Sequence, residues 1–442
     1  MRSVSWGAAF PASWPRTRIK HISRFAGGGT PDKTKPEYWN GDIPWVSPKD
    51  MKVATIVDTE DHITEEGLAS SATKLVAPGA VLLVMRSGIL RHSIPVAINR
   101  VPVALNQDMR ALTPTAQVEA RYLSRLLEGH QLQLLNAWSK VGSTVESLES
   151  DLVGETEIAV PPLAQQRAIA DYLDGATAGL DALVAAKERV LGLLAEKRRA
   201  LITRAVTRGL DPRAPLRDSG IPWLGEIPAH WAVKRLKFLV NKIEQGWSPE
   251  CYSTPALVVE WGVLKSGCCN GGRFNPDENK ALPPDREVPT ELEVRPGDVL
   301  MSRASGSTEL IGSVALVPAD VRARLLLSDK TYRLRMARGQ AIPAYLVLAL
   351  GSSVGRFQIQ RVISGAAGLA NNIAQGDINE FVLPQPDEPE QRAIVAYIDD
   401  NTASLDTLRV ATEHTITLLK ERRAALIAAA VTGQIDIPQA AT

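Results

Sequence analysis

The decapeptide "QQRAIADYLD", which begins at Gln165, returns as "EQRAIVAYID" from Glu390, 390 − 165 = 225 positions later. Residues 166–207 align with residues 391–432 without a gap, and 23 of the 42 pairs are identical. This internal repeat constrains the fold more than any other feature, because both copies are expected to build the same structure. A chain of 442 residues is also too long for one hydrophobic core. We therefore predict several domains arranged as two related halves.

The repeated segments are predicted to be long helices that pair with each other. Apolar residues recur in both copies at steps of three and four, the spacing of one helix face. An apolar seam with charged flanks is typical of a coiled coil, and a pseudo-two-fold axis would make the helices antiparallel. Gly175 and Gly179 predict a break before a long helix over about residues 177–208. The predicted pairing residues are Leu180, Leu183, Leu194, Leu201, Leu405, Leu408, Leu419 and Leu426. The alternative is an amphipathic helix on the surface of its own domain.

The segments that precede the two helices also resemble each other. "FPASWPRTRIKHI" (10–22) aligns with "IPAHWAVKRLKFL" (227–239), and "APGAVLLVMRSG" (77–88) with "RPGDVLMSRASG" (295–306). Both pairs are rich in strand formers and Gly/Pro turns, so each half is predicted to be a mixed domain. The predicted fold is α+β, with two mixed α/β domains and two long antiparallel coiled-coil helices. The predicted boundaries are 1–160, 161–211, 212–385 (with a Pro/Gly-rich connector at its start) and 386–442.

Composition indicates an ordinary globular protein. Apolar residues make up 45% of the chain, charged residues 22%, and the net charge is only +1. The first twenty residues contain prolines that interrupt any apolar stretch, so no secretory signal is predicted. The apolar runs are too short to span a membrane, and three cysteines make no disulfide framework. We expect a cytoplasmic protein.

A search for catalytic motifs finds only one weak pattern. The chain has no phosphate-binding loop, no histidine or cysteine spacing typical of zinc, and no nucleophile motif. Asp32, Asp50 and Lys52 fit the loose pattern of metal-dependent nucleases, in which two carboxylates hold Mg²⁺ and a lysine aids the attacking water. That pattern is degenerate. A nuclease is therefore only a minor alternative.

Several segments together resemble one known family. The two repeats, "PPLAQQRAIADYLD" and "EPEQRAIVAYIDD" with the helices that follow, resemble the helical spacers of type I restriction-modification specificity subunits. "DSGIPWLGEIPAHWAVKRLKFL" resembles the entry to a target-recognition domain of that family, and "YWNGDIPWVSPKDM" resembles a segment within such domains. The resemblance implies a subunit without an active site, in which each recognition domain reads one half of an asymmetric, bipartite DNA site.

The resemblance also implies partners. Two methyltransferase subunits would dock on the chain, restriction subunits would join through them, and S-adenosylmethionine, Mg²⁺ and ATP would belong to those partners. No cofactor is expected on this chain itself. The docking positions predicted from the repeat are Gln166, Arg167, Tyr172, Gln391, Arg392 and Tyr397. A bivalent scaffold that holds proteins rather than DNA is the competing hypothesis.

Candidate DNA contacts follow from basic residues on predicted strands and loops. DNA phosphates attract Lys and Arg, and arginine is the most frequent reader of guanine. In the second half, Arg333 and Arg335 are predicted to share one strand face, close to Lys330 and to the loop with Arg303 and Ser305. The candidates of the first half are Lys49, Lys52, Arg86, Ser87 and Arg91. The alternative for each arginine is a solvated outer face.

Overall fold

The computed structural model describes residues 10–140, 145–364 and 371–437. The first nine residues, where no secretory signal is predicted, lie outside this range. The chain divides into two compact units, residues 1–188 with 413–442 and residues 189–412. We call them unit one and unit two.

Unit one is built on two small sheets. A five-stranded sheet has the strand order β2-β9-β6-β7-β4, and a three-stranded sheet has the order β5-β3-β8. All four side chains of β6, "VLLV", are buried, as expected of a central strand that is covered on both faces. The strands are β2 (Ser23–Gly27), β3 (Trp39–Val46), β4 (Thr55–Ile56), β5 (His62–Ile63), β6 (Val81–Val84), β7 (Val96–Asn99), β8 (Ala104–Leu105) and β9 (Met109–Pro114), and a separate pair joins β1 (Arg16–Arg18) to β10 (Glu157–Ala159).

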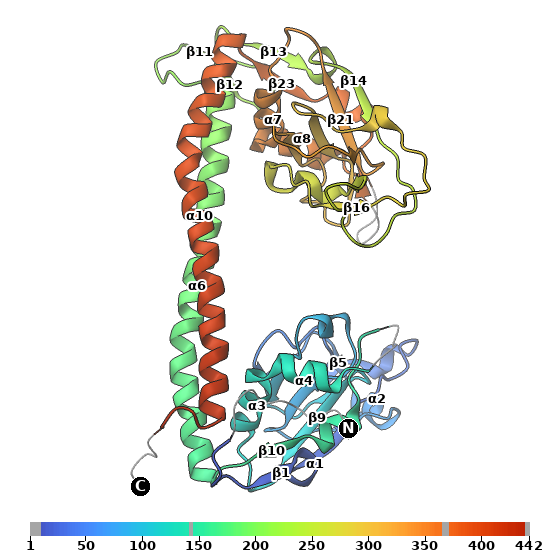
Figure 1. Ribbon diagram of the computed structural model, residues 1–442, viewed down its shortest axis with the longest axis vertical. Helices are drawn as coiled ribbons and strands as arrows, with labels where there is room; N and C mark the ends of the chain where they lie inside the picture. The colour runs from blue at the N-terminus through green and yellow to red at the C-terminus, as the bar shows by residue number, and fades with distance from the viewer. Residues whose placement is uncertain (1–9, 141–144, 365–370, 438–442) are drawn as a thin grey trace. The chain divides into compact units, whose positions relative to one another are not determined.

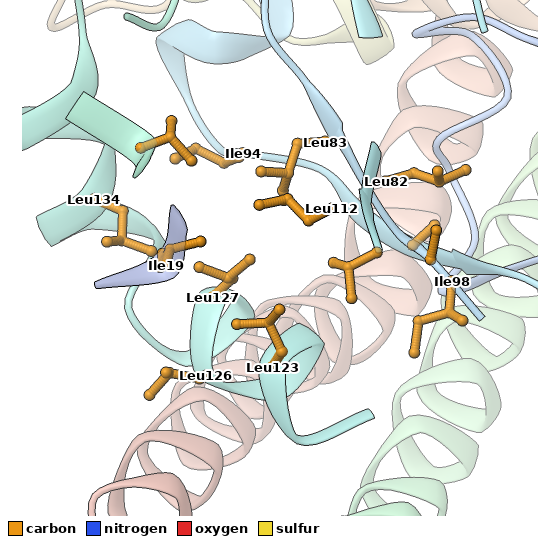
Figure 2. Close-up of a cluster of buried hydrophobic side chains, with 14 of the residues drawn as sticks. Ile19, Leu82, Leu83, Ile94, Ile98, Leu112, Leu123, Leu126, Leu127 and Leu134 are labelled. Atoms are coloured by element: carbon orange, nitrogen blue, oxygen red, sulfur yellow. The ribbon is translucent and has the colours of Figure 1, made fainter. Parts of the chain in front are cut away.

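Five short helices complete this part of unit one. They are α1 (Ile19–Ile22), α2 (Glu65–Ala69), α3 (Ala120–Gly129), α4 (Gln131–Trp138) and α5 (Ser150–Glu155). The apolar residues of α3 fall at steps of three and four and face the sheet. Figure 2 shows Leu83 and Leu112 of the large sheet and Leu127 of α3 turned toward one common space.

Unit two repeats this plan. Its larger sheet has the order β14-β21-β17-β19, and its smaller sheet has the order β16-β15-β20. The strands are β13 (Ala232–Arg235), β14 (Val240–Gln245), β15 (Gly262–Leu264), β16 (Asn279–Ala281), β17 (Val299–Ser302), β19 (Val314–Leu316), β20 (Leu325–Leu326), β21 (Thr331–Met336) and β23 (Val382–Gln385), and the short helices are α7 (Pro343–Gly351), α8 (Ser353–Val362) and α9 (Gln375–Asn379). A separate antiparallel pair joins β18 (Ala304–Ser305) to β22 (Asn371–Asn372). The connector before β13 forms a small hairpin of β11 (Leu216–Asp218) and β12 (Glu226–Pro228).

The two units share most of their strand pairings, although among the described residues β4 has no counterpart in the larger sheet of unit two. In each, the third strand of the small sheet pairs in parallel with the first (β3 with β8, β15 with β20) and the second pairs antiparallel (β3 with β5, β15 with β16). The entry strand pairs with the last strand before the long helix in both, β1 with β10 and β13 with β23. The internal repeat therefore extends over the mixed domains, and the predicted α+β architecture is confirmed.

The two long helices are α6 (Leu163–Arg208) and α10 (Glu388–Val431), and they lie side by side within each unit (Figure 1). In unit one Arg423 contacts Asp181 at 2.7 Å, and Lys420 contacts Glu188 at 3.4 Å. The number along α10 falls as the number along α6 rises, so the helices are antiparallel, as predicted. The predicted break is wrong: α6 is one helix. Gly175 and Gly179 lie on its open side, where a Cβ would meet nothing within 4 Å.

The seam between the helices follows a heptad pattern with alternating steps of four and three. Every side chain at these positions is buried or half-buried. They are Leu173, Thr177, Leu180, Val184, Lys187, Leu191, Leu194, Arg198, Leu201 and Ala205 on α6, and Ile398, Thr402, Leu405, Arg409, Thr412, Ile416, Leu419, Arg423, Leu426 and Ala430 on α10. Six of the eight predicted leucines belong to the seam. Leu183 and Leu408 do not: their side chains are 51% and 49% exposed.

Each mixed domain takes part of its core from both long helices. In unit one, Ile169 and Leu173 from the start of α6 join Ile427 and Val431 from the end of α10. In unit two, Ile394 and Ile398 from the start of α10 join Ala205 and Val206 from the end of α6. The ends of the helices are fixed in the same way. Gly209 and Gly433 both have φ +71°, and Trp231 and Trp14 pack against them.

Candidate DNA interface

Arg333 and Arg335 share one face of β21, as the two-residue period predicts. The guanidinium of Arg333 contacts Glu244 at 2.7 Å and Asp298 at 3.2 Å, and donates to the backbone oxygens of Glu293 and Glu291. Arg333 is only 1% exposed. Its predicted contact with DNA is therefore wrong: all of its hydrogen bonds go inward, and it holds β14 to β21.

Arg335 reaches the same two carboxylates from the rim of this network. Its guanidinium contacts Glu244 at 2.9 Å and Asp298 at 3.2 Å, and its side chain is 40% exposed. Burial alone would raise the pKa of Glu244, but the hydrogen bond from Arg333 and the charges of both arginines outweigh it and hold that pKa below its ordinary value. Arg335 remains available at the surface.

The loop candidates of unit two differ in exposure. Lys330 is exposed, with Asp329 at 3.4 Å. Arg303 is half-buried: it donates to the backbone oxygen of Asp329 at 3.1 Å and lies 6.0 Å from the centre of the Tyr332 ring. Ser305 accepts a hydrogen bond from the Ser307 amide. Lys330 is thus the most accessible charge of this group.

The candidates of unit one lie on exposed loops and are paired with carboxylates. Arg86 contacts Asp108 at 2.8 Å, and Arg91 contacts Glu146 at 3.1 Å. Ser87 lies between them and caps the short turn Gly88–Arg91 through the Ile89 amide. Exposed ion pairs of this kind contribute little to stability, so a DNA phosphate can replace the carboxylate partner at small cost.

The two lysines of unit one follow β3. Lys49 contacts Asp61 at 2.9 Å and Glu60 at 3.4 Å, and the hydrogen bond with Asp61 raises the pKa of Lys49. Lys52 is exposed. Both remain candidates for phosphate contacts.

The two carboxylates of the nuclease pattern accept hydrogen bonds from backbone amides and hydroxyl groups close to them in the chain. Asp50 accepts hydrogen bonds from Ser47 and from the Glu60 amide, and Asp32 accepts from Thr34. These are turn-stabilising contacts that leave little room for a shared metal ion. Within the described ranges, no group of three or more His, Cys, Asp and Glu side chains is placed to hold a metal.

The predicted docking residues separate into two groups. Gln166 and Gln391 are 0% and 1% exposed, so their predicted contact with a partner is wrong. The carboxamide of Gln166 accepts from the Glu119 amide at 2.8 Å and donates to Pro161, and Gln391 accepts from the Ile342 amide at 2.9 Å and donates to Pro386. Both glutamines join a long helix to the mixed domain before it.

The other docking candidates are exposed at corresponding positions of the two helices. Arg167 and Arg392 reach nearby carboxylates, Glu119 at 3.6 Å and Glu388 at 2.5 Å. Tyr172 and Tyr397 are exposed aromatic side chains. Leu183 lies 183 − 172 = 11 residues after Tyr172, and Leu408 lies 408 − 397 = 11 residues after Tyr397. Eleven residues are about three helical turns, so each pair lies on one helix face.

The structure shows two features that the predicted site residues do not include. Asp181 contacts Arg423 in unit one, and its counterpart Asp406 contacts Arg198 at 2.8 Å in unit two; both pairs are identical between the repeats, which was the available signal. The second feature is the run "LVV" at 257–259, whose three side chains are exposed. Its signal is an apolar run between two tryptophans, Trp247 and Trp261.

Among the described residues, no helix has both the length and the apolar content needed to cross a bilayer.

Comparison with known proteins places these features in context. Residues 11–191 match the family model of the type I restriction modification DNA specificity domain. The specificity subunit of the type I restriction enzyme EcoR124I/EcoR124II from Escherichia coli is 40% identical over 157 residues, 35% of this chain and 39% of the relative. The MjaIX specificity subunit from Methanocaldococcus jannaschii is 30% identical over 53% of each chain. The StySPI specificity subunit from Salmonella potsdam is 21% identical over 96% of this chain and 90% of the relative.

The extent of these matches varies. The chain spans 39%, 35% and 53% of the first three curated relatives. One solved structure, from work on complex assembly and conformational transition of the type I R-M system, matches 97% of this chain and 100% of its own with a TM-score of 0.62 at 18% identity. At that identity the likeness shows the fold alone.

Proposed function

We propose that the chain is a non-catalytic specificity subunit that reads a bipartite DNA site through its two mixed domains. The proposal is supported by the match of residues 11–191 to the type I restriction modification DNA specificity domain and by the similarity to type I specificity subunits. The observation that carries this proposal is the repeated topology with different loops. Because the same domain fold occurs twice in the chain, each copy can bind one half of a DNA site in the same way. The differing side chains at the loops, such as Arg86 and Arg91 in unit one and Arg303 and Lys330 in unit two, make the two half-sites unlike.

The charged candidates give this proposal its chemical basis. Lys49, Lys52, Arg86, Arg91, Lys330 and Arg335 are exposed or partly exposed cations on loops and strand ends. Phosphate contacts of this kind fix the position of a protein on DNA, whereas base contacts supply specificity. Ser87 and Arg303 lie in the corresponding segments that follow β6 and β17, and Ser305 lies in the short strand β18 directly after Arg303. Both kinds of contact are available to them.

We further propose that two methyltransferase subunits dock on the long helices, one on each copy of the repeat, and that restriction subunits join through them. Tyr172 with Leu183, and Tyr397 with Leu408, give each helix a partly exposed apolar face at the same place. Exposed apolar faces beside charged residues are typical of protein interfaces. S-adenosylmethionine, Mg²⁺ and ATP would then be bound by the partners.

The first test is the salt dependence of DNA binding. The chain, purified with its methyltransferase partner, is titrated with target duplex between 50 and 200 mM salt. Phosphate contacts predict that log K falls linearly and steeply with log salt concentration. A flat response would instead favour the bivalent protein scaffold.

The second test is modular reading. Residues 233–380 are replaced by the matching domain of a relative, and adenine methylation is mapped across the genome. We expect one half of the methylated site to change while the other half is retained, because the remaining domain keeps its own contacts. A change in both halves would contradict independent reading.

A further inference from the structure

The connection between β14 and β15 carries an exposed apolar segment that the reading scheme above does not use. Leu257, Val258 and Val259 are 66%, 77% and 71% exposed. We call these three residues the apolar tip. Three consecutive aliphatic side chains in water lose the free energy that burial would supply, so a segment of this kind usually has a binding role.

The connection is anchored at both ends. Trp247 and Trp261 pack, with Cys251, against a small core of Val263, Leu282 and Leu326. Between these anchors the Tyr252 amide donates to the backbone oxygen of Ala281, and the Ala256 amide donates to the Asn279 side chain. The connection is therefore held by the adjacent sheet rather than free to fold its tip inward.

Two arginine side chains bind the backbone oxygens of the tip. Arg322 donates to the backbone oxygens of Leu257 at 3.1 Å, Val258 at 3.4 Å and Glu260 at 3.3 Å. Arg324 donates to the backbone oxygen of Val259, and the Leu257 amide donates to Glu260. With its carbonyl groups bound to guanidinium groups, the tip directs its side chains outward.

Arg324, which makes this contact, has an unfavourable backbone conformation. Its φ is +65°, in the left-handed region that a non-glycine residue enters at a cost of about 1–2 kcal/mol. The Arg324 amide donates to Glu293 at 2.9 Å, which fixes the turn. Backbone strain of this kind persists where the surroundings determine the geometry, and it is concentrated at functional sites.

Unit one has different chemistry at the same point of its fold. Its β2–β3 connection corresponds to β14–β15 and presents Lys33 and Lys35 to solvent. The strands that flank this connection correspond in the two units, whereas the connection itself is cationic in unit one and apolar in unit two. This is expected of a surface on which the two domains read different sequences. In Figure 1 the yellow-green connection after β14 runs along the margin of unit two, away from α6 and α10.

The size of the tip favours DNA over a protein partner. A stable protein interface takes about 20–30 residues from each side, and the tip offers three. Three aliphatic side chains are instead enough to touch the 5-methyl groups of one or two thymines in the major groove. Arg286, which contacts Glu250 of the same connection at 3.8 Å, is an exposed cation available to a flanking phosphate.

We propose that the apolar tip of unit two contacts thymine 5-methyl groups within the half-site that this unit reads. This inference rests on the proposed function, since it assigns a base contact to a domain that binds DNA. It identifies Leu257, Val258 and Val259 as specificity residues, and Arg322 and Arg324 as positioning residues that act through the tip.

The test removes the methyl groups one at a time. The half-site of unit two is the half that changes when residues 233–380 are exchanged. Duplexes that carry uracil in place of each thymine of that half-site are bound to the complex of the full chain with its methyltransferase partner. Burial of one methyl group predicts that the wild type binds at least one uracil duplex roughly fourfold more weakly. In Leu257→Ser and Val258→Ser the same replacement should change affinity less than twofold, because the apolar contact is already lost.

A matched control is Val57→Ser, which changes an exposed valine of unit one. This variant should keep the wild-type response to uracil in the half-site of unit two. The proposal is overturned if no uracil replacement weakens the wild type, if both tip variants keep the full effect, or if the half-site contains only G·C pairs. Loss of the methyltransferase from the purified tip variants would overturn it too, by showing a protein contact.

The two levels of the argument are separable. A wild-type complex that does not distinguish the methylated site from a scrambled duplex would contradict the proposed function, and the tip proposal with it. A complex that keeps this preference but shows no thymine effect contradicts the tip proposal alone.

Discussion

Arg333 shows how far local sequence predicts the role of a single residue. The two-residue period of β21 correctly places Arg333 and Arg335 on one face. Their different exposure depends on Glu244 and Asp298, which lie 89 and 35 residues from Arg333 along the chain. Nothing in the residues around Arg333 indicates that two carboxylates and two carbonyl groups will enclose it. Burial of a charge is set by partners, and these partners are distant in sequence.

The carboxylate of Glu244 provides a test at this scale. Glu244→Gln removes a partly buried negative charge beside Arg333, and we expect it to lower the free energy of unfolding by roughly 1–3 kcal/mol at pH 7. The folded-state pKa of Glu244 lies below its ordinary value of 4.5, so its stabilisation is complete above that pH. It is lost as the pH falls through the lower folded-state value, where the wild type and the variant should converge. Urea unfolding at pH 7 and at an acid pH below the folded-state pKa of Glu244 measures both effects.

Glu250→Gln is the matched control, because Glu250 is exposed and its ion pair with Arg286, at 3.8 Å, is long and therefore weak. It should unfold like the wild type at both pH values. A wild-type-like Glu244→Gln at pH 7 would contradict the buried network.

At the scale of the elements, the sequence predicts the two long helices and their antiparallel pairing correctly. It does not predict all of their seam residues or the continuity of α6. Six of the predicted leucines lie in the seam, but Thr177, Lys187 and Arg198 also occupy heptad positions of the seam and do not belong to the apolar pattern. Polar seam residues are invisible to an apolar pattern. Gly175 and Gly179 were expected to break α6, yet a glycine inside a helix costs only about 1 kcal/mol, which a 46-residue helix absorbs.

The seam and the exposed face make opposite predictions for neighbouring leucines. Leu180→Asp places a carboxylate in the seam. It should lower the free energy of unfolding by roughly 1–3 kcal/mol, and the melting temperature with it. Leu183→Asp changes an exposed side chain and should leave the melting temperature unchanged. On the proposed docking face, however, it should weaken methyltransferase binding. Thermal unfolding and copurification measure the two effects.

The second repeat supplies an internal replicate, with Leu405→Asp in the seam and Leu408→Asp on the exposed face. Equal destabilisation by Leu180→Asp and Leu183→Asp would show that the heptad register is wrong. Normal methyltransferase binding by Leu183→Asp and Leu408→Asp would place the docking face elsewhere.

For the whole molecule, the central feature is that each unit is completed by both long helices. The end of α10 supplies Ile427 and Val431 to the core of unit one, and the hydroxyl of Tyr122 donates to the backbone oxygen of Val431 at 3.2 Å. The sequence predicted two domains and two helices. It did not predict that the end of the last helix belongs to unit one, because a repeat shows which segments are alike and not which ones pack together.

A circular permutant tests this arrangement. Gly433 lies against Pro11 and Trp14, so a short Gly/Ser linker can join residue 437 to residue 10. New termini are placed between Gly220 and Ile221, in the turn of the connector hairpin. We expect the permutant to have a melting temperature near that of the wild type and to keep both half-sites, because no core contact is broken. A permutant that aggregates, beside a stable wild type, would contradict the packing of α10 in unit one.

The contribution of α10 to unit one has a consequence for biosynthesis. Residues 189–412 of unit two are contiguous, so they can fold as soon as they have left the ribosome. Unit one, although it is made first, lacks part of its core until residues 426–437 emerge, and the contact between Tyr122 and Val431 closes a loop of 309 residues. During translation of more than half of the chain, the apolar residues of unit one that pack against the end of α10 therefore stay exposed. In this protein the domain that is made first is the last to be finished.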